Sequence, residues 1–248
     1  MISYAILPFY MMDFKGQRLL VIAPHPDDEV IGCGGLIQKI KKEGGKVYVL
    51  FLTLGDAQDF SKNGVSKTSE RKKEIKKVAA FLKYDNYAIA FPGNKYHLKL
   101  DRLGQLPIMD TIERGGIVSL ERVRPSIVAF PSFHSYNQDH RVAAYAAHAG
   151  LRPSEKDVKH FVSIVLGYEE LVDFWNSGEQ LIPNFFIPLN EKEIENKSKA
   201  IRLYRSQLRN FPNPRSPEAL KTLAKLRGTQ SGNDFSEGFF IHRYAHGL

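Results

Sequence analysis

The sequence predicts an α/β protein with a mostly parallel sheet and helices on both of its faces. Apolar runs of strand length recur along the chain, and most are separated by segments with helical spacing. This alternation is typical of parallel βαβ units with right-handed crossovers. In addition, a polar loop follows the first apolar run directly, at the position where open α/β sheets hold their ligands.

The first half of the chain accounts for most of the expected sheet. The residues at 18–23 are Arg-Leu-Leu-Val-Ile-Ala, and Pro24 ends this strand because proline cannot belong to a central strand. Gly44-Gly45 is a plausible stop for the helix that follows. Strands are expected at 18–23, 47–52, 87–91 and 126–131, and helices at 30–40, 69–82, 107–123 and 142–148.

The second half is expected to complete the same sheet and to form the wall of a substrate cleft. Its expected elements are strands at 161–167 and 184–188, helices at 191–210 and 217–226, a flexible loop at 227–232 and a strand-like alternation at 239–243. No linker precedes this half, so residues 1–248 are predicted to form a single domain. Because Met11 and Met12 offer later starts, residues 1–12 are interpreted as an N-terminal extension.

Composition restricts the class of protein. The single cysteine, Cys33, excludes an intramolecular disulfide and predicts a reducing, cytoplasmic location. No apolar run approaches the roughly 20 residues of a transmembrane helix, and the start of the chain lacks the basic region of a secretory signal. The formal net charge is +8, with 35 basic and 27 acidic residues, which suits nucleic acid, an anionic membrane surface or phosphorylated substrates. Much of this charge lies on helices such as 72–77 without interleaved aromatics, so we expect no nucleic-acid partner.

The loop at 24–29 places an imidazole and three carboxylates within five residues. His25 offers a ring nitrogen, and a neighbouring carboxylate offers oxygen; a second histidine would complete a catalytic zinc set. Asp27, Asp28 and Glu29 cannot all be ionised and unpaired so close together, and a divalent cation removes that conflict. A surplus carboxylate is then available as a base. The alternative is a solvated acidic turn at a helix N-terminus.

A second polar motif follows the fourth expected strand. His140 lies at the same edge of the sheet as His25, because both follow parallel strands, and it is the natural third ligand. Asp139 is placed to accept the other ring proton of a ligand histidine or to brace the loop. The glycines at 32–35 are a weak nucleotide-loop signal, and close packing of a helix on the sheet is the favoured interpretation.

The segments 24–29 and 138–141 together resemble the PIG-L/LmbE family of zinc-dependent N-deacetylases. The resemblance covers nearly the whole chain, and the first motif is highly specific. Segments 214–216, 227–228 and 237–239 look like a branch found with surface-polysaccharide biosynthesis. The resemblance implies a Rossmann-like fold and removal of an acetyl group from an N-acetylglucosamine-type sugar. The carrier of that sugar is left open between none, a nucleotide and a lipid phosphate, and the oligomeric state between a monomer and a homo-oligomer.

The resemblance also implies roles for single residues. His25, Asp28 and His140 would hold Zn2+, Asp27 would be the general base, and Arg71 would contact the substrate. We also place three residues of the second motif in the substrate-binding set: Asn137, Asp139 and Arg141.

Two departures from the family pattern matter. The family often has histidine at the position of Asn137, and often aspartate at the position of Gly93. The first puts in question the acid that protonates the leaving amine. We hypothesise that His134 or His242 assists Asp27, and the alternative is that Asp27 carries out both proton transfers alone. The second, Gly93, lacks the side chain with which the family's aspartate would contact a sugar hydroxyl. The predicted function is zinc-dependent N-deacetylation, with a catalytically degenerate sugar-binding protein or a basic nucleic-acid-binding protein as alternatives.

Overall fold

The computed structural model describes residues 12–58, 64–155, 157–175 and 182–245. The extension expected at 1–12 lies outside the described residues apart from Met12. Within these ranges, no helix combines the length and the apolar character needed to cross a membrane.

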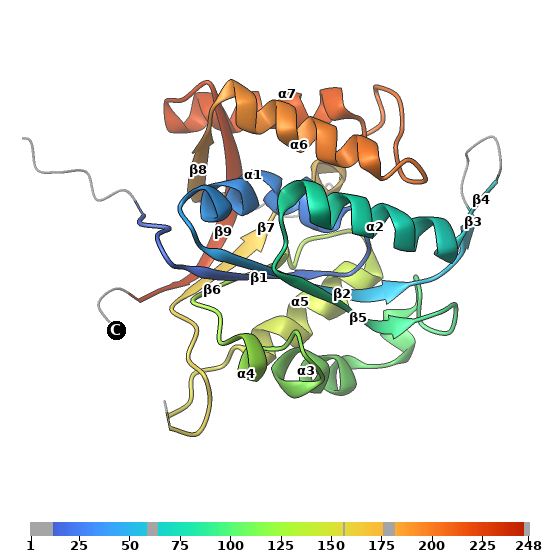
Figure 1. Ribbon diagram of the computed structural model, residues 1–248, viewed down its shortest axis with the longest axis vertical. Helices are drawn as coiled ribbons and strands as arrows, with labels where there is room; N and C mark the ends of the chain where they lie inside the picture. The colour runs from blue at the N-terminus through green and yellow to red at the C-terminus, as the bar shows by residue number, and fades with distance from the viewer. Residues whose placement is uncertain (1–11, 59–63, 156, 176–181, 246–248) are drawn as a thin grey trace, which may run out of the picture.

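The core of the molecule is a seven-stranded sheet, mostly parallel as predicted (Figure 1). Its order is β5-β2-β1-β6-β7-β9-β8, and the first five strands in this order are parallel to one another. The last two, β9 and β8, run antiparallel to their neighbours. The strands are β1 (Arg18–Ala23), β2 (Lys46–Leu54), β5 (Asn86–Pro92), β6 (Ile127–Pro131), β7 (Ile164–Tyr168), β8 (Phe185–Leu189) and β9 (Phe235–Tyr244), with a separate small ladder of β3 (Ala57–Gln58) and β4 (Val65–Ser66).

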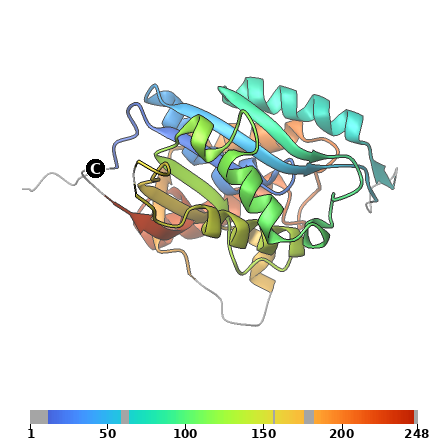
Figure 2. The same ribbon diagram turned by 90° about the horizontal axis from the view of Figure 1, so that it is seen from below.

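Helices cover both faces of the sheet. The upper face in Figure 1 carries α1 (Asp28–Lys42), α2 (Thr68–Leu82), α6 (Glu191–Leu203) and α7 (Pro217–Ser231). The other face carries α3 (Gln105–Arg114), α4 (Leu120–Val123) and α5 (Gln138–Gly150), and Figure 2 views the molecule from this side. Short 3₁₀ turns follow β5 and β7 at Leu100–Arg102 and Leu171–Trp175.

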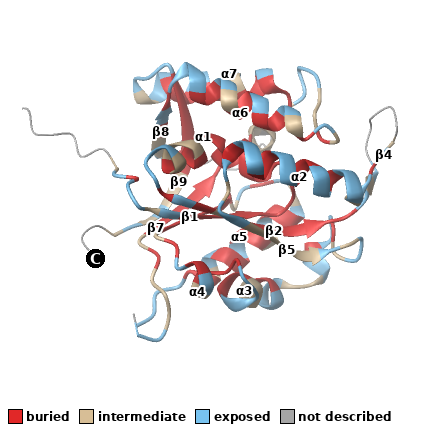
Figure 3. Ribbon diagram, in the orientation of Figure 1, coloured by how far each residue is buried: buried red, intermediate tan, exposed pale blue. Residues whose placement is uncertain are grey.

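Successive side chains along a strand point to opposite faces of the sheet, so each strand contributes to both hydrophobic cores. In β1, Leu19 and Val21 belong to the core under α1, whereas Leu20 and Ile22 belong to the core under α5. All four side chains are fully buried, as expected of a parallel sheet covered on both faces. Figure 3 shows the resulting pattern, with buried strands and helices exposed on their outer sides.

Several predicted boundaries were wrong. The helix expected at 107–123 is two helices, broken after Arg114, where a Cβ on Gly115 would lie 2.4 Å from Thr111 Cα. The helix expected at 191–210 ends at Leu203. The loop expected at 227–232 is instead helical through Ser231, since α7 ends at Gly232 with φ +71°.

The glycines of α1 allow close helix packing, as the favoured interpretation predicted. A Cβ on Gly32 would lie 2.3 Å from Tyr168 Cδ2, and one on Gly35 would lie 2.5 Å from Leu189 Cδ2. Cys33 between them is fully buried, and burial raises the pKa of its thiol well above the ordinary value. The segment therefore packs α1 against β7 and β8.

The strand order reverses between β1 and β6. The chain builds β1, β2 and β5 toward one edge, then crosses over to add β6 and β7 on the other side of β1. In open α/β sheets, such a reversal opens a ligand crevice at the carboxyl ends of the two strands. The second half supplies β7, β8 and β9 to the same sheet, as expected.

Candidate metal centre

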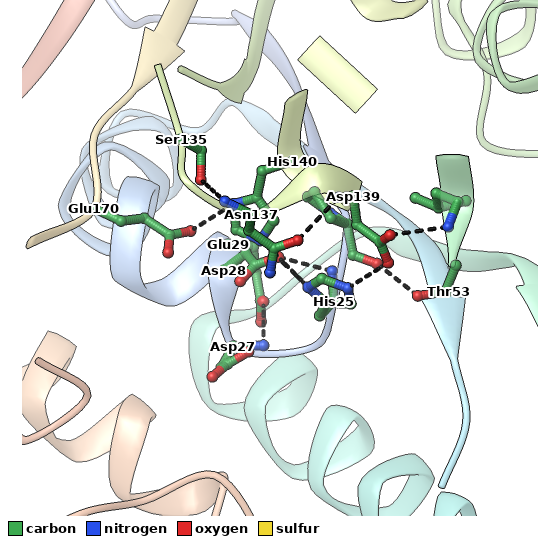
Figure 4. A network of polar contacts seen from close by, with 12 residues as sticks. His25, Asp27, Asp28, Glu29, Thr53, Ser135, Asn137, Asp139, His140 and Glu170 are labelled. Atoms are coloured by element: carbon green, nitrogen blue, oxygen red, sulfur yellow. Dashed lines mark hydrogen bonds and ion pairs between the residues drawn. The ribbon is translucent and has the colours of Figure 1, made fainter. Parts of the chain in front are cut away.

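Three side chains converge where β1 and β6 end. His25 follows β1, Asp28 lies in the first turn of α1, and His140 lies in the first turn of α5 (Figure 4). Asp28 Oδ2 lies 3.4 Å from His25 Nδ1 and 3.3 Å from His140 Nε2, and the two ring nitrogens are 3.3 Å apart. All three residues are buried. The structure thus brings together the ligand set predicted from the sequence.

The geometry of this set fits a tetrahedral metal. Donors at about 2.0–2.1 Å from a tetrahedral zinc are separated from each other by about 3.3–3.4 Å, the separations seen here. Two imidazole nitrogens and one carboxylate oxygen are also donors that zinc prefers to magnesium. The second oxygen of Asp28, Oδ1, is buried without a hydrogen-bond partner, so the carboxylate retains capacity for a ligand.

The electrostatics of the set favour a cation. Burial by itself lowers the pKa of His25, yet its hydrogen bonds to Asp139 and Asp28 raise that pKa to about 9. Burial likewise favours a neutral Asp28, but His140 and His25 hold its pKa well below the ordinary value. The buried carboxylates therefore require neighbouring positive charge, which a divalent metal supplies.

The second motif orients the ligands. Asp139 Oδ2 lies 3.0 Å from His25 Nε2, and Asp139 Oδ1 accepts a hydrogen bond from the Leu100 backbone at 2.9 Å. A proton on Nε2 leaves Nδ1 of His25 free to face the metal position. Asn137 caps α5 by accepting from the Asp139 backbone, and Arg141 donates to the backbone carbonyls of Ser135 and Tyr136. Substrate binding by these residues stays a prediction.

Asp27 differs sharply from its neighbour. Its backbone is held at φ 113° and ψ −30°, a conformation that is unfavourable for a residue with a side chain. The carboxylate is 1% exposed, and neither oxygen has a hydrogen-bond partner. Burial raises its pKa, whereas Arg215, with Nε 3.6 Å from Asp27 Oδ2, opposes that shift. A buried carboxylate that accepts no hydrogen bond and whose pKa is raised by burial is a candidate for the general base, and this role stays a prediction.

Glu29, the third carboxylate of the loop, binds neighbouring parts of the protein by hydrogen bonds. Its Oε1 accepts hydrogen bonds from the hydroxyls of Tyr84 and Tyr204 at 3.1 and 2.6 Å, and its Oε2 accepts from the Asp27 backbone. Burial raises its pKa to about 8. These hydrogen bonds give Glu29 partners other than the candidate ligands, so it is separate from the group formed by His25, Asp28 and His140.

Sequence reasoning missed three residues of the site. Glu170 Oε1 lies 3.6 Å from His140 Nδ1, His97 packs edge-on to His25 with ring centroids 5.5 Å apart, and Arg215 approaches Asp27. Glu170 follows a parallel strand, and that position could have identified it. Glu170 and Arg215 also line a cavity of about 540 Å³ beside the metal centre, together with Ile31, Tyr136 and Arg209.

Three further residues predicted to act in the site, Arg71, His134 and His242, make no hydrogen bond or ion pair with the candidate ligands among the interactions of the described residues. Arg71 is 2% exposed, and its Nη1 donates to the Gly55 carbonyl at 3.3 Å. His134 is exposed, with its backbone donating to Ser132. His242 is exposed on β9 and stacks on Phe130, with ring centroids 5.2 Å apart. Among the described residues, no contact joins either histidine to the ligand set, so their catalytic assistance stays a prediction.

Comparison with known proteins identifies related chains. The family model described as GlcNAc-PI de-N-acetylase (PIG-L) matches residues 20–150, a span that includes both polar motifs. The diacetylchitobiose deacetylase of Thermococcus kodakarensis is 26% identical over 237 residues, covering 90% of this chain and 82% of that protein. The N,N′-diacetylchitobiose deacetylase of Pyrococcus horikoshii, solved with an inhibitor, is 22% identical with a TM-score of 0.65, covering 91% of this chain and 83% of that one.

The same fold also serves another reaction. The 4-carboxy-2-hydroxymuconate hydratase GalB of Pseudomonas putida matches with a TM-score of 0.65 and 19% identity, covering 94% of this chain and 99% of that one. At such identities the solved structures establish the fold alone. The reaction must therefore be argued from the family match and from the site.

Proposed function

The chain belongs to the GlcNAc-PI de-N-acetylase (PIG-L) family, and from this premise we propose that it hydrolyses the acetamide of an N-acetylglucosamine-type sugar with a zinc ion. The observation that carries the proposal is the set of His25, Asp28 and His140 at tetrahedral separations, together with the buried carboxylate of Asp27, which accepts no hydrogen bond. His25, Asp28 and His140 would bind the metal, and the Asp27 carboxylate would be available for proton transfer.

The chain's own residues divide the chemistry. His25, Asp28 and His140 would hold the ion, which supplies a Lewis acid for the acetyl oxygen and lowers the pKa of water. Asp27 accepts a proton from the attacking water, and its fixed backbone keeps the carboxylate at the edge of the site. Asp139 orients His25 through its remaining ring nitrogen, whereas Glu170 faces the remaining nitrogen of His140 at 3.6 Å without a hydrogen bond.

Departure of the amine requires a proton. Asn137 cannot supply one by titration, and its side-chain oxygen is engaged at the start of α5. Asp27, once protonated by water, carries that proton close to the scissile bond. We therefore propose that Asp27 performs both proton transfers, as carboxylates do when they act first as base and then as acid.

The cavity beside the site supports a charged carrier on the sugar. Arg209 and Arg215 line it, and arginine pairs readily with phosphate. A nucleotide- or lipid-phosphate-linked sugar fits this lining and the net charge of +8. The cytoplasmic location and the oligomeric state stay predictions.

The test is a screen for acetate release with purified, zinc-loaded protein. N-acetylglucosamine is offered free, nucleotide-linked and lipid-linked, and Asp27→Asn serves as the matched control. We expect the wild-type protein to release acetate and free amine in equal amounts from at least one of the three substrate forms. Asp27→Asn should release almost none. Binding without acetate release would support a degenerate sugar-binding protein instead. Steeply salt-dependent DNA or RNA binding would support the nucleic-acid alternative.

A further inference from the structure

A buried chain of hydrogen bonds runs beside the metal centre and joins residues that are distant in sequence. Arg71 Nη1 lies 2.7 Å from His97 Nε2, and His97 Nδ1 lies 3.0 Å from Thr53 Oγ1. Thr53 Oγ1 donates to the Pro24 carbonyl at 3.1 Å, directly before His25 in the chain. Arg71, His97 and Thr53 are 2%, 4% and 0% exposed. Figure 4 shows Thr53 on the His25 side of the ligand cluster.

The donors fix the direction of every bond in this chain. A guanidinium only donates, so His97 Nε2 must accept from Arg71 and carries no proton. The ring proton then lies on Nδ1 and points to Thr53 Oγ1, whose own proton points to the Pro24 carbonyl. The geometry therefore specifies a neutral His97 in one tautomer.

Arg71 is held by this chain at the edge of the reaction site. Its Nη1 is shared between His97 and the Gly55 carbonyl, whereas its Nε is buried without a hydrogen-bond partner. Burial lowers the pKa of Arg71, and the carboxylates of Asp27 and Asp28 favour its charged form. The guanidinium thus lies near the base and the metal position, with a donor still available.

We propose that His97 is a positioning residue of the deacetylase, which holds Arg71 in place for substrate and ties it to the loop that carries His25. The edge-on packing of the His97 and His25 rings fits this role, because the neutral ring separates two positively charged groups, Arg71 and the metal centre. The inference rests on the proposed function only in that Arg71 contacts the sugar substrate.

A double-mutant cycle tests the proposal on the full-length, zinc-loaded protein. His97→Ala is expected to raise KM and to lower kcat/KM about 10- to 100-fold, since it removes a hydrogen bond to a charged group. In an Arg71→Ala background, the same change should alter kcat/KM less than about threefold, because the side chain that His97 positions is gone. Zinc content should remain that of wild type in all three variants.

Matched variants separate positioning from a general structural effect. His97→Gln retains a carbonyl oxygen that can accept from Arg71, so it should recover most of the lost kcat/KM. Thr53→Val keeps the shape but removes the hydroxyl and should raise KM, whereas Thr53→Ser keeps the hydroxyl and should not. The midpoint of thermal unfolding is measured for each variant. Thr53→Val provides the test if His97→Ala fails to fold.

The same cycle is run on the Kd of N-acetylglucosamine in an Asp27→Asn background, which needs no turnover. Equal effects of His97→Ala with and without Arg71 would overturn the proposal, as would loss of zinc together with loss of affinity. If wild type releases no acetate but the cycle on Kd is non-additive, the proposed reaction fails while the positioning role of His97 stands.

Discussion

Asp27 and Asp28 are adjacent in sequence yet have opposite surroundings. Asp28 Oδ2 accepts from the His25 backbone at 2.7 Å and contacts both ligand histidines. Asp27 has a strained backbone and no hydrogen-bonded oxygen. These surroundings support the proposed division of metal binding to Asp28 and proton transfer to Asp27.

Asp27→Asn should nearly abolish turnover while leaving zinc content close to that of wild type. Asparagine tolerates positive φ better than most residues, so the backbone of the loop is retained. Loss of the base is expected to lower kcat by at least about 10²–10⁴-fold. Asp28→Asn should instead lower the zinc affinity. The measurements are kcat and the zinc content per chain for both variants. If Asp27→Asn loses zinc and Asp28→Asn loses turnover while retaining zinc, Asp28 is the base and Asp27 the metal ligand.

The histidine variants test the source of the amine proton. If Asp27 performs both transfers, His134→Ala, His242→Ala and the double variant should keep kcat within about threefold of wild type. The reason is that His134 is exposed and His242 stacks on Phe130. The measurement is kcat against pH. A loss of the 10²–10⁴-fold size typical of acid catalysis, with an altered basic limb, would assign the acid to a histidine.

Helix α1 connects the metal centre to the second half of the chain. Its first turn carries Asp28, and its middle receives a buried carboxylate: Glu237 of β9 accepts from the backbone of Gly35 and Leu36 at 2.6 and 2.7 Å. Lys197 of α6 pairs with the same carboxylate at 2.7 Å. The position of the ligand helix therefore depends on strands and helices far along the sequence.

Glu237→Ala should lower the free energy of unfolding by about 3–5 kcal/mol, because it leaves a buried ammonium and two buried N–H groups without partners. Asp110→Asn is the control, since Asp110 forms an exposed pair with Arg114 and such pairs contribute about 0–1 kcal/mol. Urea unfolding of both variants gives the two values. Equal, small changes would show that the Glu237 cluster contributes little to stability.

At the scale of the molecule, the seven-stranded sheet reverses its strand order between β1 and β6, and the candidate site lies at this point. The ligands come from the loop and helix after β1 and from the helix after β6, so they meet only when the sheet is assembled. We therefore expect metal binding to be linked to folding.

Zinc should raise the melting temperature of the protein. A ligand at 100 times its Kd stabilises the folded state by about 2.7 kcal/mol, which for a chain of this size corresponds to roughly 5–11 °C. Calorimetry of chelated and zinc-loaded protein measures the shift. Magnesium should raise the melting temperature less than zinc does, and the zinc-dependent shift should be absent in His140→Ala. An unchanged melting temperature in wild type would argue against the ligand set.

Local pattern was enough to predict the class of fold, the buried strands and the approach of His25 and His140 at one edge of the sheet. The choice of Asp28 as the carboxylate of that group came from the family resemblance. Buried parallel strands require continuous apolar runs, and the polar loops that end them must lie at one edge of the sheet. Element ends were less predictable: the break at Gly115 and the continuation of α7 through 227–231 depend on packing that the local sequence does not specify.

Contacts between distant segments were decided only by the tertiary structure. Arg215 reaches Asp27 from the far end of the chain, Tyr204 holds Glu29, and His97 meets Arg71 across two loops. The sequence around Tyr204 and His97 does not distinguish them from surface positions. Arg215 lies in segment 214–216 of the family resemblance, but that segment does not indicate a contact with Asp27. Their roles arise because chain crossovers bring them together at one edge of the sheet, where burial removes water and leaves each polar atom dependent on a protein partner.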